Sequence, residues 1–156
     1  LISSGGLGTM GFALPASIGA AVGVPEAPVW VVAGDGGFQM TLQELATVVQ
    51  ERLPIKVVIL NNGYLGMVRQ WQEFFFQRNY AGTPLLGPDF ARLAEAYGIP
   101  GRTVEKRAEV VEALRWAQAV EGPALVEFRI GHEYNVFPMV PAGEPIHRML
   151  RRTAQG

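Results

Sequence analysis

Two short polar segments of the sequence carry residue types that could bind a metal ion and a phosphate group. They are GDGG at residues 34–37 and NNG at residues 61–63, and each directly follows an apolar run. A carboxylate and a carboxamide supply hard oxygen ligands, which suit Mg²⁺ or Ca²⁺ better than zinc. Glycines beside the carboxylate leave backbone N–H groups open to an anion, because no Cβ stands in the way. Together these residue types predict a site for a metal-bridged diphosphate.

Each segment also has a simpler interpretation. A GDGG segment alone is most often a tight turn, and an NNG segment alone is most often the turn of a hairpin or a loop. The functional interpretation is favoured only if folding brings Asp35 and Asn62 together, so the elements around them decide between the two.

The hydrophobic pattern places a strand directly before each polar segment. Residues 29–33 and 55–60 form largely apolar runs, each with a proline before it. Such runs are typical of strands that are buried on both faces. The residues between the two polar segments suffice for one crossover helix and the return strand. This βαβ unit predicts neighbouring parallel strands whose ends bring Asp35 and Asn62 together.

The alternation of strand-like runs and helical periods continues along the chain. Thr41 followed by Glu44 indicates a capping box, and Asp89 indicates the N-cap of a later helix. Strands separated by helices predict an α/β fold, a doubly wound parallel sheet flanked by helices, in which ligands bind at the carboxyl ends of the strands. We predict helices at residues 13–24, 41–52, 65–78, 89–97 and 108–120, and further strands at 101–105 and 123–130.

The chain divides into one domain at residues 1–130 and a C-terminal tail at residues 131–156. Several prolines and glycines interrupt the tail, and we expect it to have no regular structure. The sequence starts within a motif, without an initiator Met or the basic region of a signal peptide. We therefore expect a C-terminal piece of a larger protein.

The composition excludes several classes of protein. The 156 residues are 49% hydrophobic and 17% charged, with a formal net charge of −1, which argues against a disordered chain and a strongly basic nucleic-acid binder. Cysteine is absent, so disulfides, thiolate metal sites and a cysteine nucleophile are excluded. No apolar run reaches the roughly 18 residues of a membrane span. We expect a cytoplasmic protein with neither nucleic acid nor membrane among its partners.

Four longer segments resemble a known family: SGGLGTMGFALPASIGA, GDGGFQMTLQELATVVQERLPIKVVILNN, GMVRQWQEFF and NVFPMVPAG. A GDG segment paired with a downstream NN is the signature of thiamine-diphosphate-dependent enzymes, and the chain resembles their diphosphate-binding domain. It is more similar still to the catalytic subunit of acetohydroxyacid synthase (acetolactate synthase). The four segments together cover nearly the whole chain.

The resemblance implies thiamine diphosphate and Mg²⁺ as cofactors. Asp35, the side chain of Asn62 and the backbone oxygen of Tyr64 would bind the metal, and backbone groups of residues 36–37 would hold the diphosphate. Met10 would wedge under the cofactor and force the bend that brings its aminopyrimidine nitrogen against the thiazolium C2 proton. The implied cofactor-binding residues are Gly8, Thr9, Met10, Gly34, Asp35, Gly36, Gly37, Asn62, Tyr64, Leu65, Gly66 and Met67.

The resemblance also implies a reaction, in which pyruvate is decarboxylated and the hydroxyethyl unit is joined to a second 2-oxo acid in branched-chain amino-acid biosynthesis. Met67, Val68 and Trp71 match the family's pocket for the second substrate and for herbicides. Met67 and Trp71 are four residues apart and share a helix face. The same spacing alone is also typical of core residues.

The resemblance implies no catalytic residue within this chain. In that family the activating glutamate belongs to an N-terminal pyrimidine-binding domain of a neighbouring subunit, and a middle domain carries FAD. The implied partners are the protein's own N-terminal domains, a second subunit in a homodimer or homotetramer, and a small regulatory subunit. We expect the isolated chain to be inactive, and its tail at 131–156 to cover the active site of the whole enzyme.

Two other interpretations stay open at this point, and a third is discounted. One is another thiamine-diphosphate-dependent enzyme, such as glyoxylate carboligase or a 2-oxo acid decarboxylase. Another is a non-catalytic domain that binds a nucleotide or serves in assembly. GLGTMG at residues 6–11 also satisfies the G-x-G-x-x-G dinucleotide fingerprint, but we discount it because no predicted strand precedes it.

Overall fold

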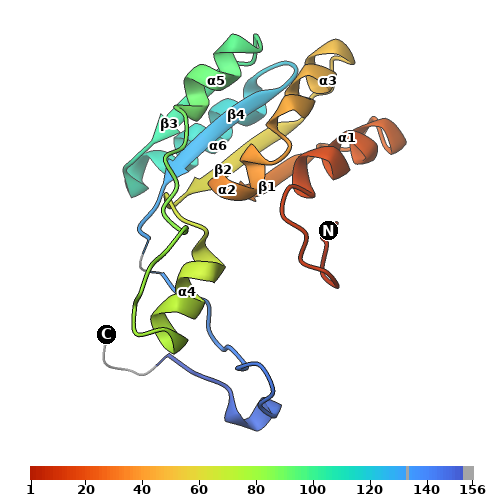
Figure 1. Cartoon of the computed structure of the whole chain (residues 1–156). Helices are drawn as coiled ribbons and strands as arrows, with labels where there is room; N and C mark the ends of the chain where they lie inside the picture. The colour runs from red at the N-terminus through yellow and green to blue at the C-terminus, as the bar shows by residue number, and fades with distance from the viewer. Residues whose placement is uncertain (133, 153–156) are drawn as a thin grey trace.

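The computed structural model describes residues 1–132 and 134–152. Within these residues the chain forms a four-stranded parallel sheet in the order β1-β2-β4-β3 (Figure 1). Its strands are β1 (Trp30–Gly34), β2 (Lys56–Asn61), β3 (Gly101–Val104) and β4 (Ala124–Arg129). The predicted α/β class and doubly wound parallel sheet are confirmed.

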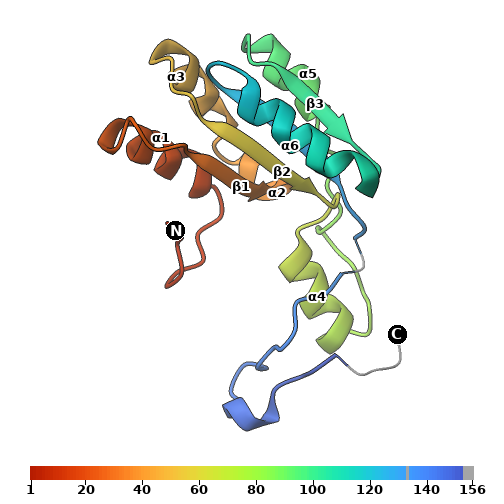
Figure 2. The ribbon, with the colours of Figure 1, turned by 180° about the vertical axis from the view of Figure 1, so that it is seen from behind.

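Helices cover the sheet on both faces. One face packs against α1 (Ala13–Gly23), α3 (Leu45–Gln50) and α5 (Phe90–Ala96), whereas α6 (Val110–Ala119) lies on the other, as Figures 1 and 2 show from opposite sides. The short helix α2 (Asp35–Gln39) starts directly at the end of β1. The polar segments at residues 34–37 and 61–63 lie at the carboxyl ends of β1 and β2.

The hydrophobic core has one part on each face of the sheet. The larger part includes Leu14, Leu45 and Ile59, together with Phe38 and Phe90, whose rings meet edge to face with centroids 5.8 Å apart. The smaller part joins α6 to β2 and β4. Because Phe38 belongs to α2, the core anchors the helix that Asp35 begins.

The outer edge of the sheet at β1 carries apolar side chains in solvent. Val32 is 61% exposed and Trp30 is 37% exposed. Val32 is the register partner of Val58, which α6 covers on the same face. The cover that α6 gives to that face therefore stops short of β1.

The start of the second predicted helix differs from the expectation. The Thr41 hydroxyl does not cap the helix but donates to the backbone oxygen of Gly11 at 2.9 Å. The Glu44 carboxylate accepts a hydrogen bond from the Thr47 hydroxyl at 3.2 Å. The predicted capping box is wrong, and a 3₁₀ turn, η1 (Leu42–Glu44), precedes α3. The Thr41 hydroxyl is unavailable to the capping box because it bonds to Gly11, which is distant in the sequence.

The later elements follow the prediction more closely. Asp89 caps α5 by accepting from the backbone N–H of Arg92 at 3.0 Å. The 3₁₀ turn η2 (Arg107–Glu109) leads into α6. The helix predicted at 65–78 is shorter, α4 (Gly66–Phe75).

The C-terminal tail packs along α4, and both project beyond the carboxyl edge of the sheet (Figure 1). The described part of the tail is not wholly irregular: it contains a 3₁₀ turn, η3 (Ile146–Arg148), and a bridge between Met139 and Leu150. The predicted tail at 131–156 also includes residues 133 and 153–156, which lie outside the described residues.

A buried glutamine attaches the tail to α4. Gln70 is 1% exposed. Its amide nitrogen donates to the backbone oxygen of Val136 at 2.9 Å, and its amide oxygen accepts from the N–H of Val136 at 2.7 Å. We expect Gln70→Leu to speed tryptic cleavage after Arg148 by about 30-fold, because two hydrogen bonds of about 1 kcal/mol each are lost. Gln50→Leu, on an exposed glutamine of α3, is the control; equal cleavage rates would contradict the expectation.

Close packing of α5 on β3 depends on a glycine. A Cβ at Gly101 would lie 2.6 Å from the backbone oxygen and 2.8 Å from the Cα of Ala91. We expect Gly101→Ala to lower the free energy of unfolding by about 3 kcal/mol, measured by urea denaturation. Gly19→Ala is the matched control: it has no neighbour within 4 Å and should stabilise α1 by about 0.5–1 kcal/mol. Two changes of the same sign would contradict this account.

Candidate cofactor and metal site

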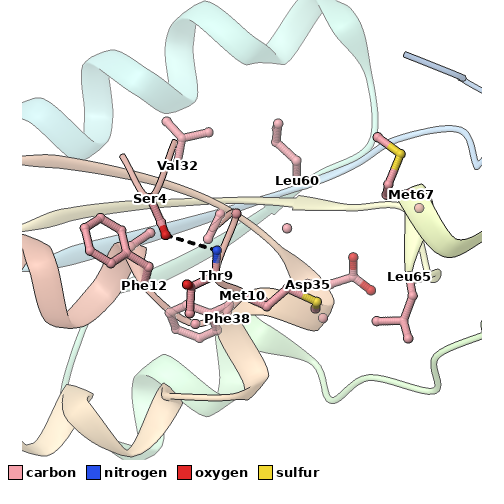
Figure 3. A pocket seen from close by; sticks show the side chains of 18 of the residues that line it. Ser4, Thr9, Met10, Phe12, Val32, Asp35, Phe38, Leu60, Leu65 and Met67 are labelled. Carbon is pink, nitrogen blue, oxygen red and sulfur yellow. Dashed lines mark hydrogen bonds between the residues drawn. The ribbon is translucent and has the colours of Figure 1, made fainter. Parts of the chain in front are cut away.

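A cleft of about 650 Å³ opens at the carboxyl ends of β1 and β2 (Figure 3). Its walls come mainly from three stretches of chain: the segment before α1, the junction of β1 with α2, and the loop from β2 into α4; Ile130, after β4, also lines it. The register pairs Gly34 with Leu60, so the residues that follow these two strands emerge side by side. The predicted meeting of Asp35 and Asn62 at one sheet edge is present, since both line this cleft.

Asp35 is a buried carboxylate with an oxygen left unsatisfied. The residue is 2% exposed, and its Oδ2 has no hydrogen-bond partner among the described residues. Burial raises the pKa of the Asp35 carboxyl, while backbone N–H groups, among them those of Asn62 and Gly36, partly offset the rise in pKa. An unpaired buried carboxylate is costly, and its surroundings suit an oxygen that binds a cation.

The loop after β2 is held in one conformation by its two asparagines. Asn61 Oδ1 accepts from the N–H of Gly63 at 3.0 Å, and Asn62 Oδ1 accepts from the N–H of Tyr64 at 3.1 Å. Gly63 has φ +68°, a left-handed conformation that glycine adopts without strain. The carbonyl of Gly63 also accepts from the N–H of Leu85 at 2.8 Å. These hydrogen bonds hold the loop in this conformation.

The donor set at this edge suits a hard cation. Within residues 1–132 and 134–152, no three His, Cys, Asp or Glu side chains come together as metal ligands. The oxygens available beside Asp35 are thus the uncharged Asn62 side chain and backbone carbonyls. One carboxylate with neutral oxygens, completed by water and phosphate, is the coordination that Mg²⁺ prefers.

The glycines after β1 open the backbone of this junction to the cleft. A Cβ at Gly34 would meet nothing within 4 Å. A Cβ at Gly36 would approach Leu65 Cδ2 and Leu85 Cδ1 at 2.9 Å each. The GDGG segment is the start of α2, not a plain tight turn, and the first N–H groups of a helix have no backbone carbonyl partner within it.

Met10 belongs to a loop that hydrogen bonds shape from within. The N–H of Gly8 donates to the carbonyl of Ser4 at 2.6 Å, and the N–H of Thr9 donates to Ser4 Oγ at 3.1 Å (Figure 3). The Met10 side chain extends toward Asp35 (Figure 3), and its Cε lies 3.5 Å from where a Gly36 Cβ would be. Met10 thus forms one wall of the cleft above the glycines.

Sequence reasoning placed most of the chosen residues in one cleft. Met67 and Val68 of the predicted substrate set line it as well. Trp71 is not among its lining residues; its ring lies against Phe75, with centroids 5.2 Å apart. All residues implied for cofactor binding line the cleft: Gly8, Thr9, Met10, Gly34, Asp35, Gly36, Gly37, Asn62, Tyr64, Leu65, Gly66 and Met67.

Sequence reasoning missed an arginine that ties α4 to the loop. Arg69 is buried, forms an ion pair with Glu73 at 2.9 Å, and lies between the rings of Tyr64 and Tyr80, 5.5 and 4.8 Å from their centroids. In the sequence, Arg69 stands within the helical period of GMVRQWQ, and this charged residue was the only indication of its role. Arg69 connects α4 to the residue whose backbone oxygen was predicted as a metal ligand.

Comparison with known proteins assigns this chain to a family. Residues 1–128 match the C-terminal TPP binding domain of the thiamine pyrophosphate (thiamine diphosphate) enzymes. The chain belongs to this family. As a thiamine pyrophosphate enzyme domain, it has the α/β class that the sequence predicted, and the GLGTMG segment at 6–11 lies in a loop without a preceding strand among the described residues.

Three relatives of this thiamine pyrophosphate enzyme domain are acetolactate synthases. It is 51% identical over 148 residues to acetolactate synthase of Mycobacterium leprae, covering 91% of this chain and 24% of that protein. It is 47% identical over 152 residues to acetolactate synthase isozyme 2 large subunit of Escherichia coli, covering 97% and 28%. Mitochondrial acetolactate synthase of Schizosaccharomyces pombe is 44% identical over 150 residues, covering 96% and 22%. The chain spans about a quarter of the length of these relatives.

The helices of this domain are short. None of those in the described residues is long and apolar enough to cross a membrane.

Proposed function

We propose that this chain is the C-terminal cofactor-binding part of an acetolactate synthase and binds thiamine diphosphate through Mg²⁺ in the cleft. The observation that carries the proposal is the buried, unpaired oxygen of Asp35, at the same sheet edge as the fixed Asn62 loop. A buried carboxylate without a partner is retained where a cation completes it. The family match and the acetolactate synthase relatives supply the identity of the ligand.

Asp35, the side chain of Asn62 and the backbone oxygen of Tyr64 are the proposed metal ligands. Water and the diphosphate would complete the six oxygens that Mg²⁺ requires. The backbone of residues 34–37 lines the cleft and is proposed to hold the diphosphate oxygens, since N–H groups at a helix start attract anions. Thiamine diphosphate, when bound, supplies the electron sink for decarboxylation.

The loop before α1 and the start of α4 are proposed to hold the organic part of the cofactor between them. Gly8, Thr9 and Met10 line one side of the cleft, and Leu65 with residues 66–67 lines the other. Met10 is proposed to set the bent shape of the cofactor. Met10 lines the cleft, and its Cε lies 3.5 Å from where a Gly36 Cβ would be; this position supports that role.

Pyruvate and a second 2-oxo acid are the proposed substrates. Met67 and Val68 line the cleft and would contact the substrates there. Trp71 follows one turn later on α4, where it is 36% exposed and its ring lies against Phe75; it is proposed to border the same pocket from the outer side. The tail, tied to α4 through Gln70, is proposed to cover the site in the whole enzyme.

The rest of the catalytic machinery is proposed to lie outside this chain. This includes the activating glutamate, the FAD-binding middle domain, the second subunit and a regulatory subunit. The proposal rests on the coverage of about a quarter of the acetolactate synthase relatives.

Product analysis of the whole subunit that contains this chain tests the proposal. With Mg²⁺, thiamine diphosphate and pyruvate, we expect acetolactate, detected by NMR; adding 2-oxobutanoate should yield the mixed product. Release of acetaldehyde without carboligation would favour a 2-oxo acid decarboxylase, and consumption of glyoxylate alone would favour a glyoxylate carboligase. Failure to bind thiamine diphosphate at all would favour a non-catalytic domain.

A further inference from the structure

Glu127 is a buried carboxylate that the proposed chemistry does not use. It lies on β4 between the apolar residues Val126 and Phe128 and is 1% exposed. Its Oε1 accepts from Asn61 Nδ2 at 2.6 Å, and its Oε2 accepts from the Thr103 hydroxyl at 2.9 Å. Arg129 Nε lies 3.7 Å from Oε1. Each carboxylate oxygen is therefore partnered, as a buried charge requires.

The partner of Glu127 leads directly to the loop after β2. Asn61 uses both ends of its side-chain amide: Nδ2 donates to Glu127, and Oδ1 accepts from the N–H of Gly63 at 3.0 Å. Two hydrogen bonds of opposite direction fix the orientation of the amide, because turning it over would place a donor against an N–H and an acceptor against a carboxylate. Gly63 in turn has the left-handed conformation, φ +68°.

Gly63 stands between the two loop residues that are proposed as metal ligands. Asn62 precedes it and Tyr64 follows it, so the direction of both depends on the conformation of Gly63. A shift of Asn61 would move the N–H of Gly63 and with it the oxygens on either side. The hydrogen-bonded chain thus runs from the interior of the sheet to the cleft.

We propose that Glu127 is a positioning residue for the metal-binding loop: through Asn61 it holds Gly63 in the conformation that aims the oxygens of Asn62 and Tyr64 at the cation. The assignment of the cation as Mg²⁺ rests on the proposed function. Groups that orient metal ligands from behind commonly change metal affinity by about 10–100-fold when they are removed. Glu127 is such a group, although it lies on a different strand from the ligands.

An exchange of donor and acceptor across one hydrogen bond tests this role without changing side-chain size. Asn61→Asp places a carboxylate against Glu127 and should raise the Mg²⁺ concentration for half-maximal thiamine diphosphate binding by about tenfold. Adding Glu127→Gln to that variant restores a donor opposite the new acceptor and should return the Mg²⁺ requirement to within about threefold of wild type. The rescue cannot come from overall charge, because removing the Glu127 charge would by itself weaken cation binding.

A second measurement needs no metal or cofactor. In the metal-free chain, hydrogen exchange of the Gly63 amide should be about tenfold faster in Asn61→Asp and in Glu127→Ala than in wild type, and protected again in the double variant. Glu105→Ala removes an exposed glutamate that also bonds Arg129, at 2.9 Å, and should leave both measurements unchanged. A loss of packing alone would lower the melting temperature without this pattern of rescue.

The two measurements separate this inference from the proposed function. If wild type binds thiamine diphosphate with Mg²⁺ but the double variant is no better than Asn61→Asp, the positioning role is overturned. Unchanged Gly63 exchange in Asn61→Asp and Glu127→Ala overturns it as well. If wild type binds no cofactor while Gly63 exchange follows the expected pattern, the loop is still positioned by Glu127 and only the proposed function fails.

Discussion

Asp35→Ala is expected to abolish the Mg²⁺-dependent binding of thiamine diphosphate, with a loss of affinity greater than about 100-fold. Asp35 is the one charged group among the proposed metal ligands, and its Oδ2 has no other partner in the described residues. Removing a group that only orients metal ligands lowers metal affinity by about 10–100-fold. Removing the ligand that supplies the only negative charge should lower it further. Titration calorimetry with and without Mg²⁺ measures the loss.

Asp35→Asn and Asp89→Asn complete that experiment. The asparagine variant at 35 keeps the size of the side chain and removes only the charge, so it should bind as poorly as the alanine variant. Asp89 is the other aspartate of the sequence, caps α5 away from the cleft, and should leave affinity unchanged when replaced. Wild-type affinity in either Asp35 variant would contradict the proposed metal site.

In the metal-free protein, Asp35→Asn should raise the stability of the fold, although the same change weakens cofactor binding. Burial raises the pKa of this carboxyl in the folded chain, so the folded state binds the proton more tightly than the unfolded state does. The stability of wild type must then fall as pH rises from the unfolded pKa through the raised pKa. We expect the asparagine variant to melt at a higher temperature than wild type near neutral pH, with a difference that shrinks toward acid pH.

Met10→Ala is expected to lower turnover of the whole enzyme by about 100-fold while changing cofactor affinity far less. The proposed metal and diphosphate contacts come from other residues, so binding should survive. A displacement of about 1 Å at a reacting centre can cost about 100-fold in rate, and loss of the side chain above Gly36 removes the wall that is proposed to set the cofactor's shape.

Met10→Leu, which keeps the bulk of the side chain, should retain most of the turnover. Steady-state kcat is compared with the dissociation constant of thiamine diphosphate for each variant. Parallel losses of affinity and turnover in Met10→Ala would show that Met10 contributes to binding rather than to the shape of the bound cofactor.

The sequence was sufficient to predict the sheet edge because the relevant signals are local. The apolar runs before residues 34 and 61 are strands, and their parallel pairing follows from the helix between them. Side chains that follow neighbouring parallel strands lie at the same edge of the sheet, and this does not depend on how the core is packed. This is why Asp35 and Asn62 could be placed together from their positions alone.

What the sequence could not supply depends on contacts between distant residues. The Thr41 hydroxyl binds Gly11, 30 positions away, and no local motif encodes that choice. Gln70 and Val136 meet 66 positions apart, as do Asn61 and Glu127. A charged residue inside the apolar strand run PALVEFRI was a visible signal for Glu127, but its partner could be found only in three dimensions.

The bare outer edge at β1 has a practical consequence for all these measurements. Its row of backbone N–H and C=O groups carries no charged side chain among residues 30–34, and Trp30 and Val32 lie in water. Edges of this kind are templates for association with other chains, which natural proteins commonly suppress with a lysine or a proline. We therefore expect the isolated chain to associate through this edge at high protein concentration, so cofactor affinity should be measured in dilute samples.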